Sequence, residues 1–269
     1  MLTGRSLGFI GGGNMAEAII RGLLAGGVSA ADIVVAEPIA GRREFLRERY
    51  GVSVSADNAA AAGADVIILA VKPQVHQAVL AGLGAATLTG KLLISIMAGV
   101  TAHTIENAAG APVRVVRVMP NTPALVLAGA SALSKGATAS DEDLDLTRQM
   151  FDLIGSTCVV DEMLMDAVTG LSGSGPAYVF AFIEALSDAG VKNGLPRETA
   201  SRLAAQTVFG AAKLVLESSE HPAVLREKVT SPGGTTIAGL ASLERDGFRG
   251  ALINAVDAAT ARSAELGKR

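Results

Sequence analysis

The stretch GFIGGGNMAEA, Gly8 to Ala18, joins a short apolar segment to closely spaced glycines near the start of the chain. Its core is Gly11-x-Gly13-x-x-Ala16. In this pattern the first glycine permits a tight turn, and the second lets the backbone approach a pyrophosphate. The small third residue keeps the following helix close to the strand. Because the apolar residues Leu7–Ile10 predict a buried strand directly before the glycines, the stretch is typical of a dinucleotide-binding loop.

A helix is predicted over Met15–Ala25, and its positive N-terminal end faces the loop. Unpaired backbone N–H groups at such an end bind anions. We therefore expect the pyrophosphate to be held by the N–H groups of Gly12, Gly13, Asn14 and Met15. The alternative is a glycine-rich turn without a ligand, which the strand–loop–helix–strand context disfavours.

The choice between NAD and NADP stays open at this point. Glu37 ends the second predicted strand, where an acid binds ribose hydroxyls and repels a 2′-phosphate. Arg42 and Arg43 follow closely and could neutralise that phosphate, or could form a solvated helix face. These residues support either coenzyme.

Further apolar segments alternate with helix-length stretches through the first part of the chain. They predict strands at Asp32–Glu37, from Val52, at Asp65–Val71, at Lys91–Met97 and at Val113–Met119. Strand, helix and strand in succession predict a parallel sheet with right-handed crossovers. Two more short strands are expected near Ser131 and Cys158, separated by an acidic helix.

From about Glu162 the strand signals stop and helical periodicity takes over. The fold class predicted is α/β, with a Rossmann dinucleotide-binding domain over residues 1–161 and an all-helical domain over residues 162–269. Helices are expected at Ala177–Gly194, Leu195–Ser219, Ala223–Val229, Thr235–Glu244 and Phe248–Leu266. The segment GLSGSGPAY, Gly170 to Tyr178, is expected to be a stiff hinge loop.

Several of these helices are apolar on more than one side. The run PAYVFAFIEALSDA offers little polar surface. A helix that is apolar all round must be buried, and a unit of about a hundred residues cannot bury several of them alone. We therefore expect an obligate homodimer formed through the helical domain.

Composition excludes several other classes of protein. The net charge is −3 and no basic stripe is present, which argues against nucleic-acid binding. A single cysteine, Cys158, and three isolated histidines predict neither a disulfide nor a metal site. No apolar run is long enough to span a membrane, so we expect a soluble cytoplasmic protein.

Two loops follow strands whose carboxyl ends should face the coenzyme. Lys72 in AVKP could reach a phosphate or ribose, or could lie along the surface. Asn121 stands in MPNTPA, where two prolines stiffen the loop and would fix polar groups near a nicotinamide. A plain structural turn is the competing interpretation of the second loop.

The stretch KVTSPGGTTIAGL, Lys228 to Leu240, is a glycine-rich loop that opens a helix. Pro232 and the glycines that follow prevent the preceding helix from continuing, and apolar residues then return at helical spacing. Bare N–H groups and two hydroxyls at a helix start suit an anion such as a carboxylate. The alternative is capping of that helix by Ser231 or Thr235.

Together these blocks resemble the pyrroline-5-carboxylate reductase family. The matching segments are GFIGGGNMAEAI, AVKPQ, MAGVT, VRVMPNTPALV, GLSGSGPAYVFAFIEALSDAGV, GLPRETA and HPAVLREKVTSPGGTTIAGL. They cover nearly the whole chain in the family's order, and the last is the most specific. The resemblance implies reduction of the cyclic imine 1-pyrroline-5-carboxylate to L-proline by NADPH or NADH. It also implies a helical dimerisation domain and larger assemblies of dimers.

The resemblance also implies roles for individual residues. Gly11 to Met15 would hold the pyrophosphate, and the coenzyme would be lined by Asn58, Ala70, Lys72 and Ala98. Thr235 and Thr236 would contact the substrate. From the loops themselves we also expect Ser231, Gly233, Gly234 and Asn121 to bind it, with Thr236 bonded to the ring nitrogen as the catalytic group. The segment EPIAGRRE departs most from members that favour NADPH.

Two rival functions share the dinucleotide loop. A hydroxyacid dehydrogenase would place a lysine base on the first helix of the second domain, yet Ala177–Ala189 contains none. A non-catalytic dinucleotide sensor would need no SPGGTT pocket. Both rivals are therefore weaker than the reductase.

Overall fold

The computed structural model describes residues 4–267, which divide into two compact units. The first unit contains the chain up to Ser174 together with the residues from Ala258 onward. The second unit is Gly175–Asp257. The domain boundary expected after residue 161 stays a prediction about where the helical domain begins.

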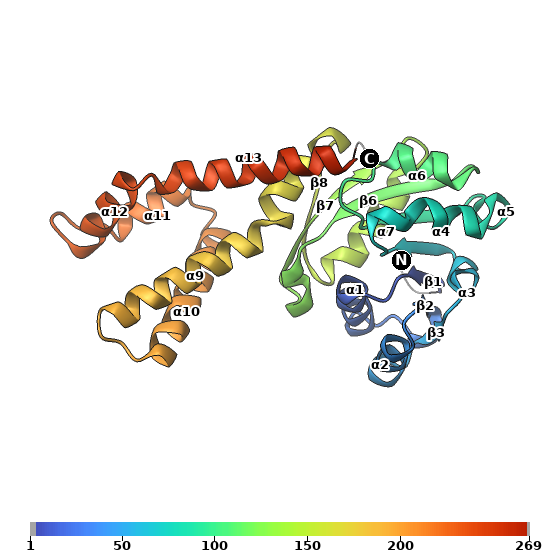
Figure 1. The fold of residues 1–269 in the computed structure, drawn as a ribbon, viewed down its shortest axis with the longest axis horizontal. Coiled ribbons are helices and arrows are strands. Elements are labelled where there is room, and N and C mark those ends of the chain that lie inside the picture. The colour runs from blue at the N-terminus through green and yellow to red at the C-terminus, as the bar shows by residue number, and fades with distance from the viewer. Residues whose placement is uncertain (1–3, 268–269) are drawn as a thin grey trace. The chain divides into compact units, whose positions relative to one another are not determined.

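In the described residues, eight strands of the first unit form one sheet in the order β3-β2-β1-β4-β5-β6-β7-β8 (Figure 1). The first six strands run parallel, β7 is antiparallel to β6, and β8 is parallel to β7. Their bounds are β1 Leu7–Ile10, β2 Ile33–Ala36, β3 Ser53–Ser55, β4 Val66–Leu69, β5 Leu92–Ser95, β6 Arg114–Met119, β7 Gly129–Lys135 and β8 Gly155–Val159. The predicted parallel sheet and both of the weaker strands are confirmed.

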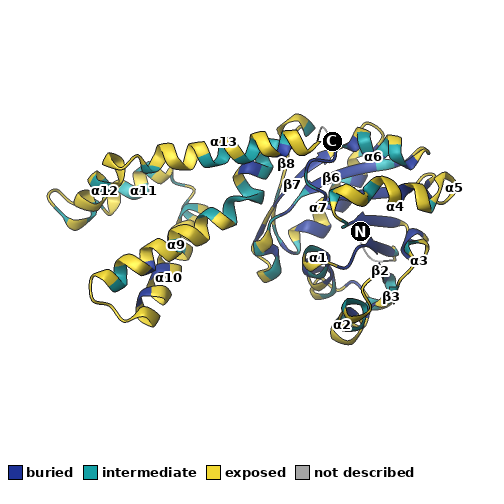
Figure 2. Cartoon of the chain, in the orientation of Figure 1, coloured by how far each residue is buried: buried dark blue, intermediate teal, exposed yellow. Residues whose placement is uncertain are grey.

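Helices cover both faces of this sheet, because alternate strand residues point to opposite sides. On one face Phe9 and Ile68 pack in a cluster with residues of α1 Asn14–Ala25, α2 Ala40–Tyr50 and α7 Asp141–Asp152. On the other face Ile10 and Ile67 pack with α3 Asn58–Ala62, α4 His76–Leu83, α5 Ala85–Leu88 and α6 Ala102–Ala109. Figure 2 shows the buried interior of these strands. Burial on both faces explains why the strand sequences are continuously apolar.

The second half is helical, as predicted. Its elements are η4 Glu162–Leu164, α8 Met165–Val168, α9 Gly175–Lys192, α10 Arg197–Ser218, α11 Pro222–Lys228, α12 Thr235–Arg245 and α13 Phe248–Gly267. The hinge loop expected within Gly170–Tyr178 is instead helical. Thr169–Gly173 forms a π-helical turn that continues from α8 and leads into α9. Its backbone is therefore hydrogen-bonded within the turn, with Ser174 N donating to Thr169 O at 2.8 Å.

The helices of the second unit have little core of their own. Of residues 175–257, all of which the structure describes, only Ser187, Ala200 and Ala204 are buried. Large apolar side chains stand open to solvent, including Phe180 at 62% and Leu216 at 81% exposure. The predominance of exposed residues in α9–α12 is visible in Figure 2. Apolar surface of this extent requires cover by another chain.

Ser219 ends α10 in the left-handed region, with φ +55°. A side chain there costs roughly 1–2 kcal/mol, and glycine avoids that cost while losing about 0.5–1 kcal/mol of chain entropy. We expect Ser219→Gly to raise the free energy of unfolding by about 0.5–1 kcal/mol. Thermal midpoints of variant and wild type at equal protein concentration measure the change.

The control is the adjacent serine. Ser218 is helical, and its hydroxyl accepts a hydrogen bond from Glu220 N at 3.3 Å. Ser218→Gly should lower the midpoint. If both variants shift the midpoint in the same direction, the left-handed conformation of Ser219 does not carry the cost assigned to it.

Candidate active site

The dinucleotide loop connects the end of β1 to the start of α1. Gly11 adopts φ +99°, and its N–H donates to Ala36 O at 2.8 Å. A Cβ atom at Gly11 would lie 2.6 Å from Ala70 O, too close for any side chain. Glycine is therefore required here by both the conformation and the approach of the neighbouring strand end.

Gly13 is the N-cap of α1 and has an extended backbone, with no side chain to cap the helix. A Cβ atom at this position would meet nothing within 4 Å. Asn14 and Met15 form the first turn. The helix start is therefore uncapped and open, which fits a pyrophosphate held by backbone N–H groups.

The peptide of Gly12 is held from both sides by residues of the β2–α2 segment. Glu37 Oε2 accepts from Gly12 N at 2.9 Å, and Arg42 Nε donates to Gly12 O at 2.5 Å. The second carboxylate oxygen of Glu37 accepts from Ile39 N at 2.9 Å. Both predicted coenzyme residues thus lie at the loop, and both also fix its conformation.

Arg42 is itself held by a second pair of side chains. Its Nη2 donates to Glu17 Oε2 at 2.6 Å, and Tyr50 Oη donates to Glu17 Oε1 at 2.7 Å. Burial raises the pKa of Glu17, but the hydrogen bonds from Tyr50 and Arg42 outweigh it and the net pKa is lowered. Burial and the bond to Glu17 raise the pKa of Tyr50. Glu17 therefore stays ionised and keeps the Arg42 guanidinium at the loop.

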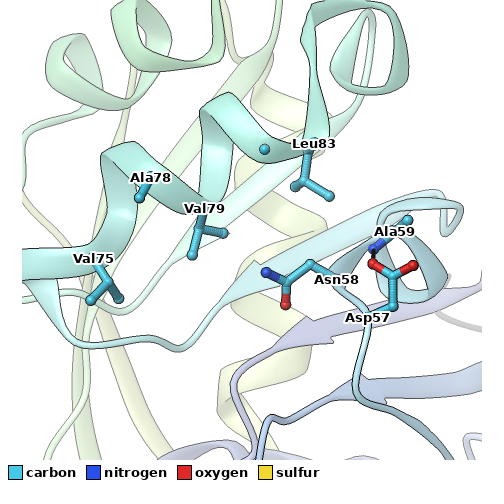
Figure 3. Close-up of a pocket in the computed structure, with 8 residues that line it drawn as sticks. Asp57, Asn58, Ala59, Val75, Ala78, Val79 and Leu83 are labelled. Carbon is cyan, nitrogen blue, oxygen red and sulfur yellow. Dashed lines mark hydrogen bonds between the residues drawn. The ribbon is translucent and has the colours of Figure 1, made fainter.

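Asn58 begins α3 and lines a cavity of about 390 Å³ between α3 and α4. Figure 3 shows its amide facing the apolar side chains of Val79 in α4 and of Val75, the residue directly before α4. Asp57 caps α3 through Oδ1, which accepts from Ala59 N at 2.9 Å. An apolar wall with one amide and one carboxylate suits the adenosine part of a dinucleotide.

The other predicted coenzyme residues lie at the same edge of the sheet. Ala70 directly follows β4, its N–H donates to Ile10 O at 2.9 Å, and it lies beside Gly11. Lys72 is exposed two residues further on. Ala98 follows β5, the next parallel strand. The carboxyl ends of β1, β4 and β5 thus bring these residues to one edge, and their coenzyme contacts stay a prediction.

Asn121, predicted to meet the substrate, has two partners within the first unit. Its Nδ2 donates to Ser172 O at 3.1 Å, and its Oδ1 accepts from Ala130 N at 2.9 Å. These bonds tie the loop after β6 to β7 and to the π-helical turn. An amide has two donors and two acceptor sites, so one N–H and one lone pair of Asn121 have no partner among residues 4–267.

Sequence reasoning missed an ion pair between a buried arginine and a half-buried glutamate that supports the loop containing Ala98. Glu162 Oε1 accepts from Arg117 Nη1 at 2.9 Å and from Ala102 N, at the start of α6, at 2.6 Å. The Arg117 side chain is 7% exposed. An arginine inside the apolar strand VRVVRVM was the available signal, because a buried charge requires a partner.

The SPGGTT loop lies in the second unit and opens α12. Gly233 has φ +68°, and a Cβ atom at Gly234 would clash with Ser231 Oγ. Gly234 is the N-cap of α12, with no side-chain hydrogen bond to the helix. The alternative of a cap by Ser231 or Thr235 is thus not realised. Thr235 is exposed, Thr236 is half-buried, and the Thr236 hydroxyl has no hydrogen-bond partner among residues 4–267.

Comparison with known proteins decides which family combines these two loops. A family model described as pyrroline-5-carboxylate reductase dimerisation matches residues 162–266. A pyrroline-5-carboxylate reductase of Synechocystis is 52% identical over 266 residues, which cover 98% of each chain. The chain belongs to the pyrroline-5-carboxylate reductase family. A second such reductase, of Methanosarcina acetivorans, is 46% identical over 100% of both chains.

Solved structures agree with this family. The pyrroline-5-carboxylate reductase of Coxiella burnetii superposes with a TM-score of 0.92 at 40% identity, covering 98% of this chain and 99% of that one. The Plasmodium falciparum enzyme, solved with NADP bound, gives a TM-score of 0.88 at 34% identity over 98% of each chain. A second family model, NADP oxidoreductase coenzyme F420-dependent, matches residues 6–99. The predicted family, Rossmann domain and helical dimerisation domain are confirmed.

Proposed function

We propose that this chain reduces 1-pyrroline-5-carboxylate to L-proline, with NADPH or NADH as the reductant. The observation that carries the proposal is that two helices, α1 and α12, each begin without a side-chain cap directly after a glycine-rich loop, at Gly13 and at Gly234. The chain that combines these two helix starts matches reductases of this family over nearly its full length. Each start offers backbone N–H groups to an anion. A pyrophosphate and a ring carboxylate are the two anions that the reaction brings.

When bound, the coenzyme supplies a hydride to the imine carbon. Gly13, Asn14 and Met15 would hold its pyrophosphate, and Ala70 and Ala98 would border it. Gly12, which was also expected to bind the pyrophosphate, already donates its N–H to Glu37 Oε2. The fit rests on the open space at Gly13, where a backbone without a side chain permits close approach. The ion pair of Arg117 with Glu162 keeps the Ala98 loop in place, because Glu162 also binds Ala102 N.

The SPGGTT loop would orient the substrate. Backbone N–H groups at the start of α12 bind the ring carboxylate, and Gly233 and Gly234 let the backbone rather than a side chain meet it. The Thr236 hydroxyl hydrogen-bonds the ring nitrogen. Protonation of that nitrogen makes the imine carbon more electrophilic. Since a pyrroline imine takes that proton from water, the chain need supply no strong acid, and positioning contributes most of the rate.

Thr236→Ala tests this assignment. Loss of one hydrogen bond to a charged nitrogen costs about 1.5–3 kcal/mol, so kcat/KM for the imine should fall by about 10- to 100-fold. Coenzyme affinity, measured by calorimetry, should not change, because the dinucleotide loop is untouched. Thr236→Ser keeps the hydroxyl and should restore most of the rate. A serine variant as slow as the alanine variant would show that the hydroxyl is not the functional group.

One assay separates the proposed function from its rivals. Purified protein is supplied with reduced coenzyme and pyrroline-5-carboxylate, and absorbance at the nicotinamide band is followed while proline is quantified. A reductase consumes both in equal amounts, whereas a sensor binds coenzyme without consuming it. A hydroxyacid dehydrogenase would need a base on α9, whose lysine, Lys192, is its last residue.

The match of residues 162–266 to the family model for dimerisation makes this chain a homo-oligomer. The subunits join through the helical region, which exposes much apolar surface. Within residues 4–267, no helix combines the length and apolarity that crossing a bilayer requires. We propose a cytoplasmic location, which the presence of only one cysteine supports.

A further inference from the structure

We infer that the coenzyme site of this chain selects NADH over NADPH, and that Glu37 is the residue that makes the choice. The inference rests on the proposed function for the identity of the coenzyme class. The sequence left the choice between NADH and NADPH open. The structure permits a choice because it shows what Glu37, Arg42 and Arg43 each bind.

Glu37 stands directly after β2, the neighbour of β1 in the sheet. It is 7% exposed, and its two carboxylate oxygens accept from Gly12 N and Ile39 N. The side chain is therefore fixed before any ligand binds. It is held at Gly12, the residue before the uncapped helix start at Gly13. A carboxylate at the end of this strand meets the adenosine ribose of a bound dinucleotide.

The hydrogen-bonding capacity of Glu37 favours hydroxyls. An ionised carboxylate accepts at about four sites, and two are occupied by Gly12 N and Ile39 N. The remaining lone pairs can accept from the 2′- and 3′-hydroxyls of NADH. A 2′-phosphate offers only acceptors and negative charge in the same place, so it would be repelled without gaining a bond.

The Glu37 carboxylate has no cationic partner of its own in the part of the chain that the structure describes. Among the ion pairs of the described residues, none includes Glu37. Arg42 is bound to Glu17 and Gly12 O. Arg43 Nη1 donates to the main-chain oxygens of Glu37 at 2.7 Å and Pro38 at 2.8 Å.

A second carboxylate adds to the negative charge at this edge. β3 pairs with β2 in parallel, with Ser55 opposite Ala36, and Glu37 N donates to Ser55 O at 2.9 Å. Asp57 follows two residues later and lines the cavity that holds Asn58. Glu37 and Asp57 therefore both follow neighbouring strands, β2 and β3, at this edge. Arg42 and Arg43 keep N–H groups beyond their bonds to Gly12 O, Glu17 and the main chain, and these are the groups to which a 2′-phosphate would have to bind.

The experiment measures binding and turnover separately. Calorimetry on the wild-type protein compares NADH with NADPH, and ADP-ribose with its 2′-phosphate. We expect each compound without the phosphate to bind at least about tenfold more tightly, and kcat/KM with pyrroline-5-carboxylate to favour NADH by a similar factor. Equal or tighter binding of the phosphorylated compounds overturns the inference, whatever the variants do.

Glu37→Gln removes the charge at nearly constant volume. We expect the NADH preference to shrink by about tenfold, through weaker NADH binding and stronger NADPH binding. Glu48→Gln in the following helix, α2, makes the same chemical change at an exposed residue and should leave the preference unchanged. Arg43→Ala should not reduce NADH binding. An unchanged preference in Glu37→Gln, or a preference for NADPH that vanishes in Arg43→Ala, assigns the choice to Arg43 instead.

The outcomes for the two proposals differ. If neither coenzyme supports turnover of pyrroline-5-carboxylate while NADH still binds more tightly, the proposed function fails and the selectivity of Glu37 stands. If turnover occurs with NADPH at least as well as with NADH, the function stands and the selectivity fails.

Discussion

Gly13→Val leaves the first unit folded and lowers coenzyme affinity by more than about a hundredfold. The fold is spared because a Cβ atom at Gly13 meets nothing within 4 Å in the chain. Affinity is lost because the branched side chain takes the space through which a pyrophosphate reaches the N–H groups of α1. Calorimetric titration with NADH and NADPH measures the affinity, and circular dichroism with the thermal midpoint checks the fold.

The matched control is Gly63→Val. Gly63 is exposed at the end of α3, has φ −66°, and a Cβ atom there would be 3.8 Å from the nearest atom, Ala60 O. The same substitution at this position should leave coenzyme affinity unchanged. If Gly13→Val binds either coenzyme with wild-type affinity, the assignment of the loop is wrong, because a pyrophosphate bound at the N–H groups of α1 would have to pass the valine side chain.

Gly8→Ala is expected to destabilise the first unit by about 3 kcal/mol or more, at the upper end of what overpacking costs. Gly8 lies in β1, and a Cβ atom there would clash with Ala61 O and lie 2.7 Å from the Ala61 carbonyl carbon. These are backbone atoms of α3, so they cannot swing aside as a side chain would. Urea unfolding at fixed protein concentration measures the loss.

Gly13→Ala serves as the comparison, because its Cβ atom meets open space. It should change the free energy of unfolding by no more than about 0.5 kcal/mol. The two alanine variants lie five residues apart and make the same chemical change. If they unfold at the same urea concentration, the close approach of β1 to α3 is not present in solution.

Much of the fold could be predicted from local patterns. The helix expected over Thr235–Glu244 is α12, Thr235–Arg245, and the strand expected over Val113–Met119 is β6, Arg114–Met119. These elements are encoded by the spacing of apolar residues and by glycine and proline at their ends, which act within a few residues. Prediction failed at Gly170–Tyr178, because serine and glycine favour a loop locally, whereas Thr169–Gly173 continues a helix with wider hydrogen bonding.

The candidate site divides in the same way. Gly11 and Gly13 were recognised because a tight turn and an open backbone are local requirements. Arg117 and Glu162 were missed as a pair because 45 residues separate them. The bond from Asn121 to Ser172, 51 residues away, could not be predicted for the same reason, and the contact of Asn121 with the substrate stays a prediction. Which polar groups meet depends on how the elements pack. A contact between residues far apart in the sequence is not encoded by the local spacing of apolar residues.

The sequence by itself determined that this chain has a Rossmann domain, a helical domain that needs a partner, and two glycine loops suited to anions. Only the tertiary structure decided the use of its charged residues. Glu37 and Arg42 could each be assigned to a coenzyme from the sequence, but β2 and α2 bring both of them to the peptide of Gly12, 25 and 30 residues earlier. The physical reason is that a buried carboxylate or guanidinium takes the partner that the fold presents to it.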